Sequence, residues 1–305
     1  MSDVLATRVG ALELEHPVMN ASGTLDPLAA RAAGLEIDRE LALLVTKTVT
    51  PLPREGNEAP RVSEVEGGML NSIGLPNPGL AAFIAETLPA VRALGRPLVV
   101  SAGGFEHADY ELACRRLDGE PGIAALELNV SCPNVKSGCI SIGSDPAETE
   151  AVVRLCRAAT RLPLWVKLSP NVADLAAIAC AAERGGADAL VLTNTLRGLA
   201  IDHWTLKPLL GGVTGGLSGP ALKPVALAAV QTCRAACALP VVGVGGIASG
   251  WDALEFLAAG ASAVQVGSAA FREPLLARRI RRELATLLTD RGLMAESVAK
   301  TTTLD

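Results

Sequence analysis

The chain of 305 residues is marked by short apolar runs separated by longer segments of mixed polarity. Most of the runs are apolar without a break, which is typical of parallel strands covered on both faces and not of half-exposed strands. The predicted strands are 17–22, 42–48, 97–103, 123–130, 163–169, 189–195, 240–246 and 263–269.

Helical patterns fill most of the intervals between these runs. The clearest lie at 146–159, 172–184, 220–236 and 251–259, and a further one closes the chain at 272–287. Eight strands alternating with helices, without a Gly/Ser linker, predict a single (β/α)₈ TIM barrel domain over residues 1–305. The connection after the second strand is unusually long, so we expect residues 51–77 to form an active-site loop over the barrel mouth.

Polar residues or glycines end nearly every predicted strand. They are Ser22, Lys47, Thr48, Ser101, Asn129, Lys167, Asn194, Thr195, Gly245, Gly246, Gly267 and Ser268. Active-site residues of such barrels lie at the C-terminal strand ends, where the βα loops gather. Any one of these residues alone is more often an ordinary loop entry, but their recurrence along the chain indicates a functional site.

Glycines at the ends of the last two strands fall where this fold usually binds phosphate. Glycine lets backbone N–H groups approach phosphate oxygens closely, and a helix N-terminus adds favourable potential. Residues 215–219, after the sixth strand, are a third glycine-rich candidate. The stretch 243–248 also fits a dinucleotide-binding pattern, but the next strand offers no acidic residue for a ribose, so we discount a Rossmann domain.

Two lysines, Lys47 and Lys167, each end an apolar strand. An ammonium pointing into the barrel mouth is costly unless an anion compensates it. The alternative is a lysine whose ammonium reaches the surface. An anionic ligand in the mouth would account for both positions.

Amide and thiol side chains complete the candidate chemistry. Asn71, Asn129 and Asn194 suit a ring of alternating N–H and C=O groups, although an asparagine is more often a loop or cap residue. Cys132 lies just past the fourth strand, and none of the histidines is placed to act as a base. An unperturbed thiol has a pKa of about 8.5, so modest tuning makes it a usable base.

The net charge and the spacing of the cysteines limit which ligands, metals and cellular locations are expected. The net charge of −5, without a run of Lys or Arg, argues against nucleic acid or an acidic membrane surface. The seven cysteines and three histidines lack the spacing of a zinc, iron–sulfur or disulfide site, so we expect no metal in this chain. A cytoplasmic location is expected, because the cysteines fit a reducing compartment and the first residues show no secretory signal.

Four motifs carry a resemblance to a known family. They are Asn129-Val-Ser-Cys-Pro-Asn-Val-Lys136, Asn-Ser-Ile-Gly-Leu-Pro-Asn-Pro-Gly at 71–79, Thr-Asn-Thr at 193–195, and the segment 214–224. Together they resemble class I dihydroorotate dehydrogenases, over residues from about 20 to 291. The Val135-Lys136 continuation and the Lys47-Thr48 pair are most similar to the NAD-linked subtype.

The resemblance implies an FMN-binding barrel that oxidises dihydroorotate to orotate in pyrimidine biosynthesis. Cys132 would take a proton from C5 while hydride leaves C6 for FMN N5. Lys47 would touch both flavin and substrate, and Lys167 would lie at the flavin N1–O2 edge and stabilise the reduced anion. The implied substrate-binding residues are Lys47, Asn71, Ser72, Ile73, Gly74, Leu75, Asn129, Asn194 and Thr195. The implied FMN contacts are Ser22, Lys47, Thr48, Ser101, Asn129, Lys167, Thr193, Gly219, Gly245, Gly246, Gly267 and Ser268.

The same subtype implies protein partners. A second subunit carrying FAD and an iron–sulfur cluster would pass electrons to NAD, and the catalytic chain would form a homodimer core.

Three positions depart from the family pattern. In the expected active-site loop 132–145, Cys139 stands where the family has glycine and Ile142 where it has an aromatic. Ser101 stands where an asparagine toward the flavin is expected. Replacing glycine reduces backbone freedom where a lid needs it. The departures therefore bear on turnover and lid behaviour more than on the type of reaction.

Two other functions stay open. The FMN barrel of a dihydropyrimidine dehydrogenase shares Asn-x-Ser-Cys-Pro, but Val135-Lys136 and the carboxylate-suited Lys47 argue against it. Flavin reduction by dihydrouracil and not by dihydroorotate would identify it. A non-catalytic flavoprotein paralogue, serving as a scaffold for a redox partner, has support only from the altered residues 138–139. Bound FMN that dihydroorotate fails to bleach would identify that function.

Overall fold

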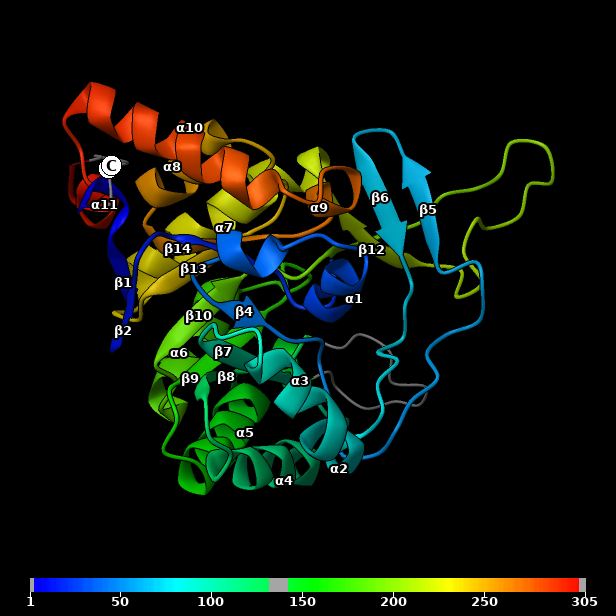
Figure 1. Ribbon diagram of the computed structural model, residues 1–305. Coiled ribbons are helices and arrows are strands. Elements are labelled where there is room, and N and C mark those ends of the chain that lie inside the picture. The colour runs from blue at the N-terminus through cyan, green and yellow to red at the C-terminus, as the bar shows by residue number, and fades with distance from the viewer. Residues whose placement is uncertain (1–2, 132–141, 302–305) are drawn as a thin grey trace.

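The computed structural model describes residues 3–131 and 142–301 and contains a sheet of eight parallel strands that curls into a barrel (Figure 1). The strands are β3 (Val18–Asn20), β4 (Leu44–Val45), β7 (Leu98–Ala102), β8 (Ile123–Asn129), β9 (Leu164–Leu168), β10 (Ala189–Leu192), β13 (Val241–Val244) and β14 (Ala261–Val266). Each overlaps one predicted run, and their order in the sheet is β3-β14-β13-β10-β9-β8-β7-β4. The predicted (β/α)₈ TIM barrel is confirmed.

The first and second barrel strands are joined largely by one side chain. Asn20 Nδ2 donates to the Val45 carbonyl oxygen at 2.7 Å, and the Val45 N–H donates to Asn20 Oδ1 at 2.9 Å. The Ala42 N–H also donates to the Val18 carbonyl oxygen at 3.0 Å. Because both strands are short, the Asn20 amide satisfies backbone groups that would otherwise be buried without partners.

Helices surround the barrel. They are α1 (Pro27–Ala32), α2 (Leu80–Ala82), α3 (Leu88–Arg92), α4 (His107–Asp118), α5 (Pro146–Ala159), α6 (Leu175–Gly185), α7 (Lys223–Ala236), α8 (Gly250–Ala258), α9 (Ala269–Arg272), α10 (Leu276–Arg291) and α11 (Val298–Thr301). Helix α5 has its predicted bounds, because Asp145 caps its N-terminus and Pro146 occupies its first position. The closing helix was predicted from residue 272. It divides into α9 and α10 because Pro274 interrupts it.

Two concentric apolar layers stabilise the barrel. Inward-facing residues such as Met19, Val99 and Trp165 fill the lumen, and Val9 and Leu14 of the hairpin β1 (Thr7–Val9) and β2 (Leu12–Leu14) pack against them. The outer layer lies between strands and helices and is rich in alanine. The lower lumen is therefore a packed core, and ligands have room only at the strands' C-terminal ends. The hydrophobic pattern did not predict the hairpin.

A second, antiparallel sheet stands beside the barrel mouth. Its order is β11 (Leu196–Gly198), β12 (Gly215–Ser218), β6 (Gly68–Asn71) and β5 (Val62–Val65). The expected loop 51–77 thus contains a hairpin, and the glycine-rich segment 215–219 is mostly a strand. Glycine is required at Gly216 because a β-carbon there would collide with the Thr195 side chain.

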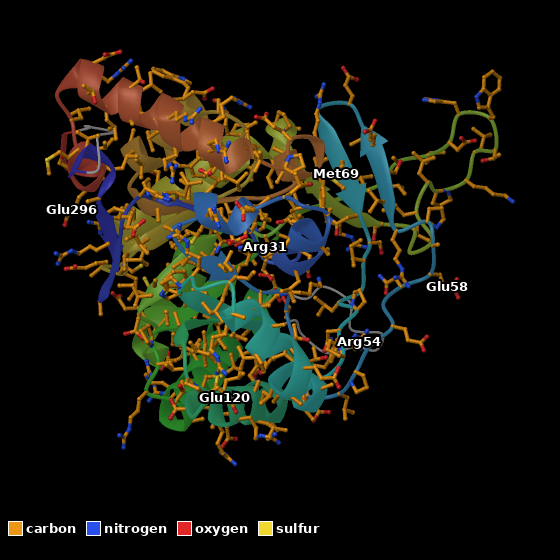
Figure 2. The ribbon with its side chains drawn as sticks, in the orientation of Figure 1. Arg31, Arg54, Glu58, Met69, Glu120 and Glu296 are labelled. Carbon is orange, nitrogen blue, oxygen red and sulfur yellow. The ribbon has the colours of Figure 1, made fainter. Side chains whose placement is uncertain are left out.

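The two sides of the molecule are distinct. Figure 2 labels Met69 and Arg54 on the side that carries the small sheet, and Glu296 on the opposite side near β1. The loop between β11 and β12 extends outward beyond the small sheet (Figure 1). Within residues 3–131 and 142–301, no helix combines the length and the apolar character needed to cross a membrane.

We predict that Asn20→Ala lowers the free energy of unfolding by about 2–4 kcal/mol, because it leaves two buried backbone groups of Val45 without partners. Urea unfolding followed by circular dichroism measures this loss. Thr286→Ala on the exposed face of α10 is the control and should change stability by less than about 0.5 kcal/mol. Equal midpoints for the two variants would contradict the closing role of Asn20.

Candidate functional site

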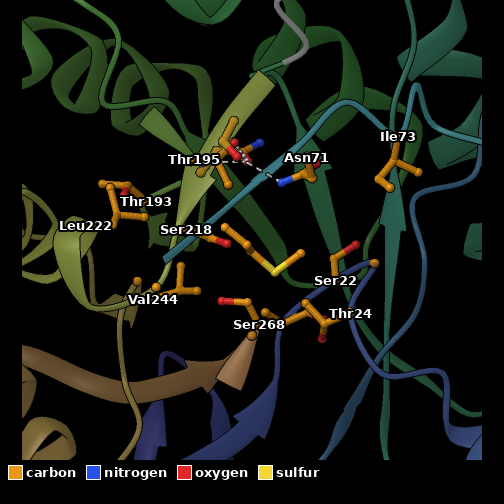
Figure 3. A pocket seen from close by; sticks show the side chains of 18 of the residues that line it. Ser22, Thr24, Asn71, Ile73, Thr193, Thr195, Ser218, Leu222, Val244 and Ser268 are labelled. Carbon is orange, nitrogen blue, oxygen red and sulfur yellow. Dashed lines mark hydrogen bonds between the residues drawn. The ribbon is translucent and has the colours of Figure 1, made fainter. Parts of the chain in front are cut away.

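A cavity of about 1800 Å³ opens at the C-terminal ends of the barrel strands, with the small sheet as one wall. Figure 3 shows Ser22, Thr24 and Ser268 facing Asn71 and Ser218 across this space. Pockets for a single small molecule usually measure about 300–1,000 Å³. The space therefore suits a cofactor together with a substrate.

Nearly all the predicted site residues line this cavity. They are Ser22, Lys47, Thr48, Asn71, Ser72, Ile73, Gly74, Leu75, Asn129, Lys167, Thr193, Asn194, Thr195, Gly219, Gly245, Gly246, Gly267 and Ser268. Most come from the ends of barrel strands far apart in the sequence, as barrel closure requires, and the segment 71–75 and Gly219 follow strands of the small sheet.

Two predictions are not among these residues. Ser101 is fully buried and is absent from the cavity lining, and its Oγ lies 2.9 Å from Thr48 Oγ1. It supports Thr48 from behind instead of facing the cavity. Cys132, Cys139 and most of the expected loop 132–145 lie outside the described residues, although Gly143 and Ser144 line the cavity.

Thr48 is the centre of a hydrogen-bond network across the strand ends. Its Oγ1 lies 2.9 Å from Ser101 Oγ and 3.4 Å from Ser22 Oγ. Asn129 Nδ2 donates to the same oxygen at 3.3 Å, and Asn194 Nδ2 donates to Asn129 Oδ1 at 3.4 Å. The network orients two of the predicted amides toward the cavity before any ligand binds.

The segment 71–75 is held against the small sheet. Asn71 Nδ2 donates to the Gly216 carbonyl oxygen at 3.2 Å, and Asn57 Nδ2 donates to Ser72 Oγ at 2.9 Å. Leu75 has a φ of 55°, a conformation that is uncommon outside glycine and is found at functional sites. The predicted substrate segment is therefore fixed by contacts with residues distant in sequence.

The phosphate candidate at Gly245-Gly246 is a tight turn. Both glycines have positive φ, 134° and 73°, and a β-carbon at Gly246 would lie 2.8 Å from the Gly219 carbonyl oxygen. The turn leads into α8, whose N-terminus Ser249 caps by accepting from the Asp252 N–H. Only glycine allows the backbone to run this close to the loop before α7.

A half-buried cluster of ion pairs supports this turn. Lys223 Nζ donates to Asp252 Oδ1 at 2.6 Å and to Glu255 Oε2 at 2.7 Å, and these bonds raise the pKa of Lys223. Burial would raise the pKa of Asp252, but bonds from Lys223, the Ala248 N–H and Ser249 outweigh it and the pKa is lowered. The lowered pKa favours the carboxylate form of Asp252, which accepts a hydrogen bond from the Ala248 N–H of the turn.

The floor of the cavity carries a charge pair that the sequence reasoning missed. Lys167 Nζ lies 3.6 Å from Glu127 Oε1, and Glu127 Oε2 accepts from Gln265 Nε2 at 2.7 Å. The available signal was an acidic residue inside an apolar strand, two positions before Asn129 and so on the same face.

Sequence reasoning also missed cationic and aromatic residues that line the cavity, two of them in connections between strands and helices and three in α9 and α10. They include Arg54, Phe105, Phe271, Arg272 and Arg279. The Arg54 guanidinium lies 4.5 Å from the centre of the Phe105 ring, a cation–π contact that joins the segment 51–77 to the loop after β7. This pairing depends on tertiary structure alone.

The residues present fit FMN. Lys47 and Lys167 supply positive charge, glycine turns after β13 and β14 suit a phosphate, and amides from separate strands face the space between. Thr193 is buried, and its hydroxyl has no hydrogen-bond partner among the described residues, although it lines the cavity. A ligand with polar ring atoms would satisfy it.

Comparisons with known proteins agree with this geometry. The family model described as dihydroorotate dehydrogenase matches residues 4–288. A protein of Desulforudis audaxviator, named "Dihydroorotate dehydrogenase B (NAD(+)), catalytic subunit", is 48% identical over 288 residues, or 94% of each chain. Proteins of the same name from Trichlorobacter lovleyi and Geobacter sp. strain M21 are 46% identical over 293 and 295 residues, covering 96% and 97% of this chain and 96% of each relative.

We predict that Lys223→Met weakens FMN binding about tenfold, since losing the charge-assisted hydrogen bonds to Asp252 and Glu255 loosens the support of the glycine turn. Titrating the apoprotein with FMN and following flavin fluorescence gives the dissociation constant. Lys207→Met, at an exposed lysine of the outward loop, is the matched control. An unchanged constant for Lys223→Met would show that the cluster does not support the cofactor site.

Proposed function

We propose a set of residue roles and an electron route for this chain, which belongs to the dihydroorotate dehydrogenase family. It is an FMN-dependent oxidoreductase that converts dihydroorotate to orotate in pyrimidine biosynthesis. The observation that carries the proposal is the meeting of the family's motif residues, from distant strand ends, around one cavity.

The reaction removes a proton and a hydride from neighbouring carbons of the substrate. FMN, when bound, supplies the hydride acceptor for C6. Cys132 takes the C5 proton on its thiolate, which is the form that acts as a base. Asn71, Asn129 and Asn194 hold the pyrimidine amides, and Lys47 binds its carboxylate. The preformed network through Thr48 supports the roles of Asn129 and Asn194, because it orients their amides before the substrate arrives, and the bond to Gly216 does the same for Asn71.

The remaining residues hold substrate or cofactor. Ser72, Ile73, Gly74, Leu75 and Thr195 complete the substrate site. Lys167 would lie at the N1–O2 edge of FMN and stabilise the reduced anion, and the flavin and its phosphate would be held by Ser22, Thr48, Thr193, Gly219, Gly245, Gly246, Gly267 and Ser268. Ser101 acts through Thr48, since the two hydroxyls are in contact.

The comparisons favour this function over the alternatives left open by the sequence. Relatives matched over nearly their whole length carry the dihydroorotate dehydrogenase name, which argues against a dihydropyrimidine dehydrogenase barrel. The preformed polar network and charged floor argue against a paralogue that has lost catalysis.

NAD is the final electron acceptor in our proposal, reached through a separate subunit that carries FAD and an iron–sulfur cluster. The relatives' name includes both NAD(+) and "catalytic subunit", which supports a partner. The chain has no cysteine spacing for an iron–sulfur cluster of its own. We place the complex in the cytoplasm, which cell fractionation would check.

A second copy of the chain completes the proposed assembly. The outward loop between β11 and β12 exposes large apolar side chains, with Trp204 93% and Leu206 78% accessible. Asp202 accepts hydrogen bonds from the Trp204 and Thr205 N–H groups, so the tip of the loop has a defined conformation. Apolar exposure of this kind marks protein contacts, and a monomer mass by light scattering would rule out the dimer.

The central experiment adds dihydroorotate to the purified flavoprotein without oxygen. We expect the flavin absorbance to bleach with dihydroorotate and not with dihydrouracil. Colour should return on adding fumarate or NAD only if that compound is a direct acceptor, and we expect neither to act without the partner subunit. Bleaching by dihydrouracil alone would overturn the substrate, and recovery with fumarate would overturn the acceptor.

We predict that Cys132→Ser retains FMN and binds orotate but slows flavin bleaching by at least about a hundredfold, because a serine hydroxyl is a far weaker base than a thiol. Stopped-flow absorbance measures the rate. Cys114→Ser, at a buried cysteine of α4 that does not line the cavity, controls for loss of a thiol as such. Equal bleaching rates in Cys132→Ser and the native protein would remove Cys132 from the mechanism.

A further inference from the structure

Beneath the cavity, two opposite charges are buried side by side in the barrel lumen. Glu127 is completely inaccessible and the Lys167 side chain is 7% exposed. Glu127 and Lys167 lie on adjacent strands, β8 and β9. Gln265 reaches them from β14, which is separated from β8 by β13, β10 and β9, so its bond to Glu127 crosses the lumen.

Lys167 and Glu127 lie close together without a direct hydrogen bond between them. The 3.6 Å between Lys167 Nζ and Glu127 Oε1 exceeds hydrogen-bond length, and this oxygen has no hydrogen-bond partner among the described residues. Lys167 Nζ also approaches Gln265 Oε1 at 3.4 Å. An ammonium has three donors, so Lys167 retains hydrogen-bonding capacity for the cavity that it lines.

A buried carboxylate here is not explained by stability alone. Buried ion pairs often add little to stability compared with apolar residues of the same volume, and the lumen below is filled by apolar side chains such as Val99 and Trp165. The carboxylate does change the electrostatic field at the floor of the cavity. The Glu127–Lys167 pair is formally neutral, whereas Lys167 without Glu127 would bring a formal charge of +1.

We propose that Glu127 is the counter-charge that sets how strongly Lys167 stabilises the negative charge gained by a flavin on reduction. The inference rests on the proposed function, in which FMN would occupy the cavity with Lys167 at its N1–O2 edge. Glu127 offsets the ammonium, lowers the flavin midpoint potential and eases transfer of electrons to a partner. It acts through the field around Lys167 and touches neither proton nor hydride.

The test is the midpoint potential of bound FMN, measured by chemical reductive titration against a reference dye. Glu127→Gln keeps the shape and the bond to Gln265 while removing one negative charge. We expect its potential to rise above that of the native protein and that of Lys167→Met to fall. Gln265→Met is the matched control, since it removes the bridging amide without changing charge and should shift the potential least.

The double variant Glu127→Gln/Lys167→Met distinguishes an effect of the Glu127 charge from an effect of Glu127 on the position of Lys167. It contains neither buried charge, so it can be measured even where a single variant fails to fold. If Glu127 acts by its charge, the double variant has a higher potential than Lys167→Met alone. If Glu127 merely holds Lys167 in place, the two potentials are equal and the proposal is overturned. A fall or no change in Glu127→Gln also overturns it.

Failure of this inference and failure of the proposed function give different results. The dye titration needs no substrate, so it reports on Glu127 even if dihydroorotate does not bleach the flavin. An unchanged potential in Lys167→Met would instead remove Lys167 from the flavin edge, and with it the premise.

Discussion

Closing eight parallel strands into a barrel brings the inward-facing side chains of every strand into one narrow lumen. In this chain the lower lumen is filled by apolar residues and covered by the β1–β2 hairpin, so polar inward-facing residues can be accommodated only near the C-terminal strand ends. Closure itself depends on the Asn20 amide, which bridges β3 and β4. The position of the site follows from this packing.

Burial at that level makes each polar group depend on its neighbours. Thr48 gathers hydroxyls and amides from several strands into one network, and Lys167 is balanced by Glu127. In a region largely excluded from water such groups are costly alone and strongly interacting together. The interactions that offset the cost of burying these polar groups therefore also orient hydrogen-bond donors and charges for a ligand.

The small antiparallel sheet adds what a bare barrel lacks. Strand pairs from the β4–β7 connection and from the region after β10 meet beside the mouth and carry the segment 71–75 to the cavity. The substrate segment is thus held by long-range pairing, while the phosphate turn at Gly246 is held by the Lys223–Asp252 pair. Two separate supports fix the two ends of one site.

Unbroken apolar runs determined the barrel and its strand positions, and the polar residues at their ends, Ser101 excepted, determined a set of residues that line the cavity, because strand periodicity and the strand-end rule are local properties of the sequence. The reaction was indicated by the resemblance that the motif around Cys132 and three other motifs carry to a known family. Only the tertiary structure decided that Ser101 stands behind Thr48, that the segment 215–219 is mostly a strand, and that Glu127 faces Lys167 with Gln265 reaching across the lumen. These relations join residues up to 138 positions apart, and no local pattern encodes which distant side chains a closed barrel brings together.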